Sequence, residues 1–245
     1  VAGPRLTAAF DDGQVLTRAT VAGSGTASLT PANAADYTRL SMSAGQAITA
    51  DFKGEGLLDK IVTQGRTNIR MDVPNRNAEA ANKSVTADAV TTTFAPNGKD
   101  IGSAVAVGNA QLVVSPLNAS ETNYQTAIDA PRFDCEFFAS GNDPRMCVAS
   151  SKTKTVRTPT RPSSERGVQN MASNKLVANF DPQSRELASL EALGDARFSE
   201  LDRNGTSGRI VYTSADQTVR LREANPVVWD GKARAKAPEI DWNTK

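Results

Sequence analysis

Apolar and polar residues alternate along most of this chain, and a period of two predicts β-strands, not helices. In five segments a bulky apolar residue, a small residue and an aromatic residue follow one another at steps of two. These triplets are Leu6, Ala8, Phe10; Ile48, Ala50, Phe52; Val90, Thr92, Phe94; Phe133, Cys135, Phe137; and Leu176, Ala178, Phe180. The last members of the triplets lie 42 or 43 residues apart. This regular spacing predicts stacked units that bury their apolar faces against their neighbours.

A second marker follows each of these phenylalanines by 13 or 14 residues, at Gly23, Gly65, Gly108, Ser151 and Gly194. On both sides of the last four markers, small or apolar residues continue at steps of two. Examples are Ile61, Thr63, Thr67 and Ile69, then Ala104, Ala106, Ala110 and Leu112, and then Leu190, Ala192, Ala196 and Phe198. We therefore expect strands on both sides of each marker.

In four of the five repeats, turn-forming residues lie between the triplet and the second marker. Examples are Asp11-Asp12-Gly13 and Ala95-Pro96-Asn97-Gly98. Polar segments rich in Pro, Asn and Ser follow the second marker, at 72–83, 116–123 and 158–169. Each unit is then a β-hairpin with a longer return loop. The expected fold is all-β, an elongated antiparallel stack of about six repeats of about 42 residues that forms one domain over residues 1–245.

The amino-acid composition and net charge restrict the classes of function that this chain can have. The hydrophobic fraction of 39% and the aromatic fraction of 5% are low, as expected if the strands enclose a narrow slot lined by Ala, Thr and Val. A net charge of +1 argues against a general nucleic-acid-binding protein. The sequence has no apolar window of about 18 residues, so it predicts no membrane-spanning segment.

The chain contains no histidine, which removes the usual general base and the commonest metal ligand. Carboxylates such as Asp51, Asp88, Asp134 and Asp195 fall on the polar parity of the strands, as expected of solvated strand faces. We therefore expect no catalytic residues, no metal site and no cofactor.

Cys135 and Cys147 are the only cysteines, too few for a zinc site without histidine. The repeat places both on the same face of one hairpin, which permits a cross-strand disulfide in an oxidising compartment. The alternative is a pair of buried free thiols in a reducing compartment.

The motifs Gly208-Arg209-Ile210-Val211-Tyr212 and Asn225-Pro226-Val227-Val228-Trp229 resemble the strand motifs of the OstA-like family, the LptA- and LptC-like periplasmic proteins of lipopolysaccharide transport. Ala50-Asp51-Phe52 is similar to an earlier unit of that family, whereas Ala224 replaces the family's usual glycine before Asn225. The resemblance implies a β-jellyroll of two antiparallel sheets that gape along one edge. It also implies a periplasmic, non-enzymatic carrier in a Gram-negative bacterium, either a soluble bridge or a component tethered to the inner membrane by a segment outside this chain.

In such a carrier, the acyl chains of lipopolysaccharide or a related glycolipid would lie in an apolar groove. Exposing a twelve-carbon chain to water costs about 10 kcal/mol, at about 0.8 kcal/mol per methylene group. We expect one wall to consist of Leu6, Phe10, Ile48, Phe52, Val90, Phe94, Phe133, Phe137, Leu176 and Phe180, with Ile61, Ile69, Leu112, Leu190 and Phe198 across the groove. By residue type alone, a closed core without ligand is the favoured interpretation of these side chains, and only the family resemblance favours a groove.

An open stack leaves unpaired strand edges at both ends, so we expect end-to-end β-augmentation with homologous jellyroll modules or with itself. Five basic residues between Lys152 and Arg166 either contact lipid phosphates at the groove mouth or form a solvated face. Two alternatives from other classes remain: a purely structural β-solenoid scaffold or filament with a closed core, and a carbohydrate-active β-solenoid enzyme.

Overall fold

The computed structural model describes residues 1–30, 39–54, 56–75, 80–120, 122–140, 142–163 and 166–243. These residues form strands and loops without any helix, and the 17 strands join one sheet whose pairings are all antiparallel. The strands are β1 (Arg5–Phe10), β2 (Leu16–Ala22), β3 (Gly25–Leu29), β4 (Arg39–Ala44), β5 (Ala47–Lys53), β6 (Leu57–Asp72), β7 (Ala81–Phe94), β8 (Ile101–Pro116), β9 (Tyr124–Phe137), β10 (Pro144–Pro159), β11 (Gln169–Phe180), β12 (Leu187–Glu200), β13 (Arg203–Thr213), β14 (Thr218–Arg222), β15 (Val227–Trp229), β16 (Arg234–Lys236) and β17 (Glu239–Asn243). The predicted all-β class is confirmed, whereas the count of about six repeats stays a prediction.

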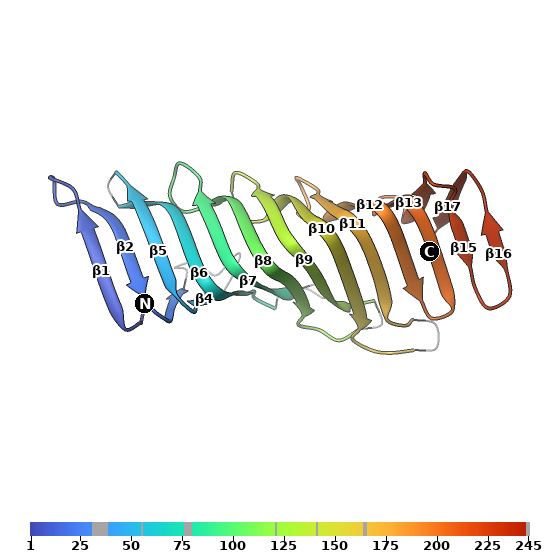
Figure 1. Ribbon diagram of the computed structural model, residues 1–245, viewed down its shortest axis with the longest axis horizontal. Helices are drawn as coiled ribbons and strands as arrows, with labels where there is room; N and C mark the ends of the chain where they lie inside the picture. The colour runs from blue at the N-terminus through green and yellow to red at the C-terminus, as the bar shows by residue number, and fades with distance from the viewer. Residues whose placement is uncertain are drawn as a thin grey trace.

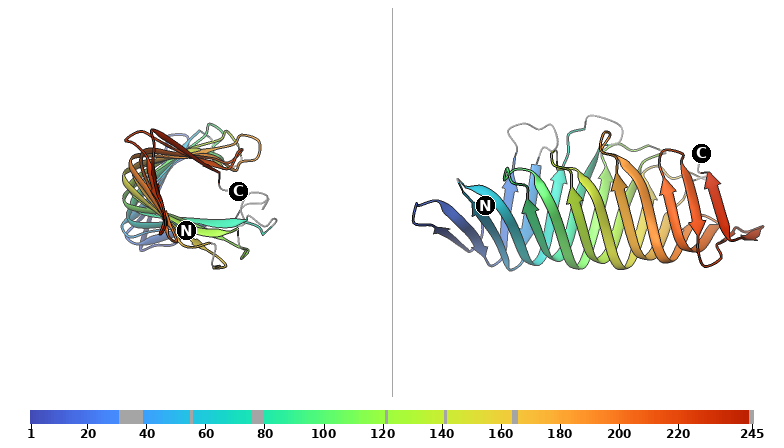
Figure 2. Two further views of the ribbon diagram at one scale, coloured as in Figure 1. Left: turned by 90° about the vertical axis from the view of Figure 1, so that its right-hand side faces the viewer. Right: turned by 90° about the horizontal axis from the view of Figure 1, so that it is seen from above.

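The strands lie side by side along the long axis of the molecule, from β1 at one end to β16 and β17 at the other (Figure 1). Seen end-on, the sheet is curled into a C, with two layers that face each other and are joined along one side (Figure 2). The two predicted sheets are therefore two arms of one continuous sheet, and the long strands β6 to β13 cross from one arm to the other.

We call the two layers the first and the second arm. The first arm contains β1, β2, β5, β14, β17 and the segments 57–64, 89–94, 101–107, 132–137, 144–150, 175–180, 187–193 and 209–213. The second arm contains β3, β4, β15, β16 and the segments 67–72, 81–87, 110–116, 124–130, 153–159, 169–173, 196–200 and 203–207. The hairpin turns close the first arm, and the return loops close the second arm.

The line where the arms meet coincides with the second sequence marker. Val107 pairs with Arg132 and Ala110 with Ala130, so Gly108 and Asn109 of β8 lie opposite a single residue of β9. The same register shift occurs at Gly65 of β6, Ser151 of β10 and Gly194 of β12. An extra residue in one strand bends that strand, so a line of β-bulges folds the whole sheet.

The bulge residues adopt a left-handed backbone, which explains the glycines. The φ angle is 73° at Gly65, 77° at Gly108 and 74° at Gly194. A side chain at Gly108 would also place its Cβ atom 2.8 Å from the Cβ atom of Asp88. Ser151, the exception among the markers of the long strands, has a φ of 69° and therefore adopts a conformation that costs a non-glycine residue about 1 to 2 kcal/mol.

Beside the bend, one cross-strand row runs along the inside of the first arm through the whole sheet. Its members, each paired with the next, are Leu6, Val21, Ile48, Thr63, Val90, Ala106, Phe133, Ala149, Leu176, Ala192, Ile210, Leu221 and Ile240. From Val90 to Ala192 large and small residues alternate, so a large side chain on one strand covers the small one on the next. All members between Leu6 and Ile240 are buried. We call this row the floor.

The second arm contributes small residues to the same buried strip: Thr67, Ala87, Ala110, Ala130, Thr153, Ser173, Ala196 and Ser207. Hydroxyl groups among them find partners within the strip, because Thr67 donates to Thr63 Oγ1 at 2.9 Å and the Thr153 and Ser173 hydroxyls lie 2.8 Å apart. Small residues fit the inside angle of a folded sheet, where larger side chains of the two arms would collide. This geometry accounts for the low hydrophobic and aromatic content.

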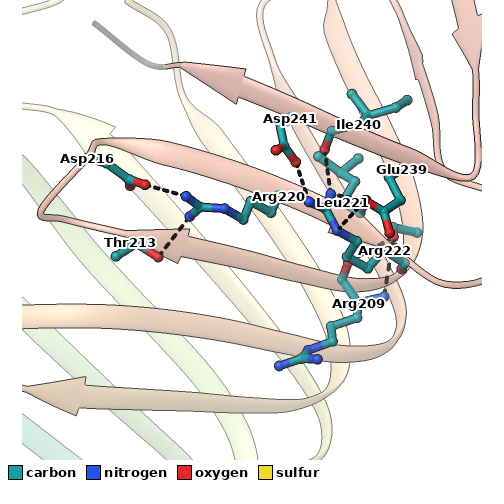
Figure 3. Close-up of polar contacts among 10 residues, drawn as sticks. Arg209, Thr213, Asp216, Arg220, Leu221, Arg222, Glu239, Ile240 and Asp241 are labelled. Carbon is teal, nitrogen blue, oxygen red and sulfur yellow. Dashed lines mark hydrogen bonds and ion pairs between the residues drawn. The ribbon is translucent and has the colours of Figure 1, made fainter.

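The C-terminal strand β17 is fixed to β14 by polar contacts on the outside of the first arm (Figure 3). Arg222 of β14 lies 2.6 Å from the Asp241 carboxylate and 3.4 Å from that of Glu239, and it donates to the Ile240 carbonyl at 3.2 Å. Its neighbour Arg220 bonds Asp216 in the preceding turn. The inside of the same strands continues the floor with Leu221 and Ile240, so both faces of β14 anchor β17.

The bend gives a stability prediction. Replacing Gly108 by Ala combines left-handed strain with the collision at Asp88, so we expect a loss of about 2 kcal/mol of unfolding free energy. The matched control is Gly102→Ala in the same strand, where φ is not left-handed and the nearest atom to a new Cβ lies 3.5 Å away. Midpoints of urea unfolding compare the two variants, and equal losses would contradict the assigned role of Gly108.

Candidate functional site

The inner face of the curled sheet is the candidate functional site. Above the floor, the first arm carries a second inner row: Ala8, Ala19, Ala50, Ile61, Thr92, Ala104, Cys135, Cys147, Ala178, Leu190, Tyr212, Val219 and Trp242. The second arm carries a corresponding row: Ala27, Met42, Ile69, Val85, Leu112, Ile128, Thr155, Met171, Phe198, Gly205, Val228 and Ala235. Most of these side chains are only half-buried, so apolar surface stays in contact with solvent on both arms.

The predicted lining residues all lie on inner rows of the sheet, but two of them lie on a different arm from the one expected. Ile61 and Leu190 belong to the first arm, beside the triplets, and not across from them. Both precede the marker glycine of their strand, and the strand crosses to the other arm only after that residue. Of the five residues expected across the groove, Ile69, Leu112 and Phe198 lie on the second arm.

Exposure of the predicted residues increases with distance from the bend. Ile48, Val90, Phe133 and Leu176 belong to the floor and are buried. The half-buried ones are Phe52, Ile61, Ile69, Phe94, Leu112, Phe137, Phe180, Leu190 and Phe198. At the N-terminal edge, Leu6 is 66% exposed and Phe10 is 60% exposed, because no further strand covers β1.

Sequence reasoning missed the second-arm residues of the odd-numbered strands, namely Val85, Ile128 and Met171, which complete the row of Ile69 and Leu112. Each of these residues lies five positions before the first member of the triplet that follows in its strand, so it has the opposite parity and an extension of the triplet pattern does not find it. The triplets drew attention to one arm only.

The two outer margins of the inner face differ in chemistry, and we call them the first and the second lip. The first lip consists of Phe10, Leu16, Phe52, Leu58, Phe94, Ile101, Phe137, Pro144, Phe180 and Leu187, all apolar. The second lip consists of Leu40, Met71, Lys83, Val114, Thr126, Arg157, Gln169, Glu200 and Arg203. The second lip thus changes from apolar at β4 and β6 to mainly polar and charged from β7 onward.

Arg157 is the central residue of the polar part of the second lip. It shares the inner parity of β10 with buried Thr155 and Pro159, and its guanidinium lies 4.5 Å from the ring centroid of the buried Tyr124. Nη1 donates to Gln169 Oε1 at 2.7 Å. Arg157 is exposed at the margin of the sheet; partial desolvation by its neighbours lowers its pKa, and the weaker opposing influences come from Tyr124, Tyr212 and Glu200. Its parity places Arg157 on the inner face of the second arm, beside Tyr124 and Gln169 of the same arm.

The arms approach each other near the C-terminal end. Phe198 of the second arm and Trp242 of the first arm have ring centroids 5.6 Å apart, a distance typical of a favourable aromatic contact. The inner space is therefore bridged at this end by the two arms' own side chains.

The outer face of the sheet is polar, and it carries the Asp side chains that were expected on solvated strand faces. Asp51 pairs with Arg18 at 2.6 Å, Asp88 accepts a hydrogen bond from Asn109, and Asp134 pairs with Arg132. Within the described part of the chain, no three Cys, Asp or Glu side chains converge as metal ligands. The described ranges also contain no helix with the length and apolarity that a membrane crossing needs.

The predicted disulfide is confirmed. Cys135 of β9 and Cys147 of β10 are directly paired across the strands, with Cα atoms 4.1 Å apart, and their sulfur atoms are bonded. The bridge occupies the second inner row of the first arm, next to Ala104 on one side and Ala178 on the other. It therefore lies on the same inner face as the predicted lining residues.

Residues 163–245 match the family described as LptA/(LptD N-terminal domain) LPS transport protein. This segment is therefore similar to a lipopolysaccharide-transport family. The match confirms the resemblance that the sequence motifs indicated. The chain is also similar to LptH from Pseudomonas aeruginosa, described as the LptA homologous periplasmic component of a lipopolysaccharide transport device, with 13% identity over 70% of this chain and 100% of that chain and a TM-score of 0.42. No curated protein matches the chain in sequence.

The disulfide gives a second prediction. We expect no alkylatable thiol in the native protein without reductant and two after reduction, counted by mass spectrometry. Replacing both cysteines by Ala removes a crosslink between residues 12 positions apart, which costs about 3 kcal/mol of unfolding free energy in the chain-entropy account. The alanines at the flanking positions of the row show that the small side chain fits there. Unchanged stability would contradict a structural role for the bridge.

Proposed function

We propose that this protein is a non-enzymatic periplasmic carrier that shields the acyl chains of lipopolysaccharide, or of a related glycolipid, against the inner face of its curled sheet. The observation that supports the proposal most is the row of half-buried apolar side chains on both arms, from Ile69 to Phe198 on the second and along the first lip. A closed structural scaffold would bury these side chains against one another. The match of residues 163–245 to a lipopolysaccharide-transport family favours this cargo.

The physical role of the inner face follows from the hydrophobic effect. An acyl chain crossing an aqueous compartment needs continuous apolar cover, because every exposed methylene group costs about 0.8 kcal/mol. The paired rows offer the same kind of surface at each strand, so a chain can move along the stack without a large change in free energy. Breaking a covalent bond is not part of this role.

Site-specific photocrosslinking tests the carrier role. A photoreactive amino acid at Leu112 faces the inner side of the second arm, and the same group at the adjacent Val113 faces the outer side of the same strand. We expect crosslinks to the acyl chains of bound lipopolysaccharide from position 112 and not from position 113. Competition by unlabelled lipopolysaccharide should remove the signal.

Crosslinking of equal yield from both positions, or from neither, would contradict the proposal. The second outcome, together with denaturation midpoints that match the parent protein, would favour the closed scaffold.

The strand edges support a second part of the proposal, end-to-end pairing with homologous modules or with itself. Among the described strands, β1 pairs only with β2 and leaves Leu6 and Phe10 exposed, whereas the opposite end presents β17 with Ile240 and Trp242 on its inner parity. Pairing of β17 with β1 of the next module would continue the floor and the second inner row. The other C-terminal edge, β16, carries Arg234 and Lys236 and is less suited to pairing.

The edge pairing is tested with a double substitution, Leu6→Asp with Phe10→Asp, which places charge where a second module would bury the inner rows. We expect the parent protein to associate with increasing concentration in sedimentation equilibrium, and this variant to stay monomeric. The matched control, Thr7→Asp with Ala9→Asp, adds the same charge on the outer parity of β1 and should associate like the parent. A parent protein that is monomeric at all concentrations and binds no homologous module would overturn this part of the proposal.

A further inference from the structure

The two lips of the inner face are unlike each other, and this difference carries a further inference that rests on the proposed function. The first lip is apolar along its whole length, whereas the second lip carries Lys83, Arg157, Glu200 and Arg203. An amphiphile lying against the inner face has its polar head at one margin. Its head group is stabilised only at the second lip.

Arg157 is the cation of that lip whose surroundings fit an anionic ligand best. Nη1 is engaged by Gln169, while the other guanidinium N–H groups have no acceptor among the described residues. No carboxylate within the described ranges pairs with it, because Gln169 stands between Arg157 and Glu200 and donates to Glu200 Oε1 at 3.0 Å. The free edge of a guanidinium offers two parallel donors, the arrangement that matches the oxygen atoms of a phosphate group.

The Arg157 side chain is also preorganised for ligand binding by its neighbours. Tyr124, which is 8% exposed, supports the guanidinium through a cation–π contact of 4.5 Å, and Gln169 fixes it from the side. Two residues earlier in the same strand, on the same inner face, the buried hydroxyl of Thr155 has no hydrogen-bond partner among the described residues. The site therefore combines an unpaired cation and an unsatisfied polar group.

Its distance from the apolar rows suits an amphiphile. Arg157 lies two residues from Thr155, which belongs to the same row as Ile128, Met171 and Phe198. Two residues of an extended strand span about 7 Å. A ligand whose phosphate lies at Arg157 can therefore place its acyl chains directly on these apolar side chains.

We propose that Arg157, positioned by Tyr124 and Gln169, binds a phosphate group on the head of the carried glycolipid and so orients the cargo with its head at the second lip. Of the basic residues between Lys152 and Arg166 in the described ranges, Lys154 lies on the outer parity of the arm, and Arg157 alone combines the inner parity with these contacts. The remainder of the basic run lies at the bend or in the return loop.

The test compares lipid A that carries its phosphates with lipid A dephosphorylated enzymatically, both with the same acyl chains. The variants are Arg157→Gln and, as matched control, Arg197→Gln, which removes the same charge from the outer parity of the same arm at an exposed position. We expect the parent protein and Arg197→Gln to bind the phosphorylated lipid about tenfold more tightly than the dephosphorylated one, the gain typical of a charge-assisted hydrogen bond.

Arg157→Gln should lose this discrimination and keep the affinity for the dephosphorylated lipid, while Arg157→Lys should regain part of it. Equal discrimination by Arg157→Gln and the parent would overturn the inference and leave the carrier role intact. Failure of the parent to bind either lipid would overturn the carrier role itself. Displacement of the lipid by an equal concentration of inorganic phosphate would assign the site to free phosphate and not to a head group.

Discussion

The line of β-bulges along the second marker is the constraint on which the rest of this structure depends. Without the extra residue at Gly65, Gly108, Ser151 and Gly194, strands of up to 16 residues would form one open, twisted sheet with both faces in water. The bulges fold the sheet on itself and bring two apolar faces together. Because the bulges recur at nearly constant spacing, all bends align into one straight floor.

The folded sheet buries only a narrow strip of side chains and leaves most of its other side chains at least partly in water. This explains why the apolar fraction of the sequence is low for a protein of this length. The buried strip consists largely of Ala, Thr and Ser, whose hydroxyl groups bond within the strip, as between Thr63 and Thr67. Farther from the bend the arms carry Ile, Leu, Met and Phe, which remain partly in water. In a compact globular protein such side chains would pack against one another in a core, whereas here they line the two facing arms.

Much of this architecture could be predicted from the sequence, because the repeat fixes parity, turn positions and strand length together. The predicted return loops at 72–83, 116–123 and 158–169 match the ends of β6 and β7, of β8 and β9, and of β10 and β11 within a few residues. The position of Cys147 opposite Cys135 followed from the same register. These features depend on local spacing, which the sequence contains explicitly.

The arrangement of the arms could not be predicted, since parity gives the face of a residue but not the point where a strand changes arm. This is why Ile61 and Leu190 were expected opposite the triplets and lie beside them. Arg157 was one member of a basic run in the sequence, and only the pairing of β10 with β9 and β11 on the second arm brings it beside Tyr124 and Gln169.

In the proposed carrier role, the two lips have different consequences for a ligand that moves along the stack. The apolar first lip repeats from Phe52 to Phe180 with the same chemistry, so acyl chains lose and gain equivalent contacts at each strand. The second lip is not periodic in charge: where β10 contributes Arg157, β6 contributes Met71 and β8 contributes Val114. Repetition on one side favours movement, and a charge at one position on the other side favours a pause there. The direction of movement must come from an energy source outside this fold, because a repeated surface alone has no preferred end.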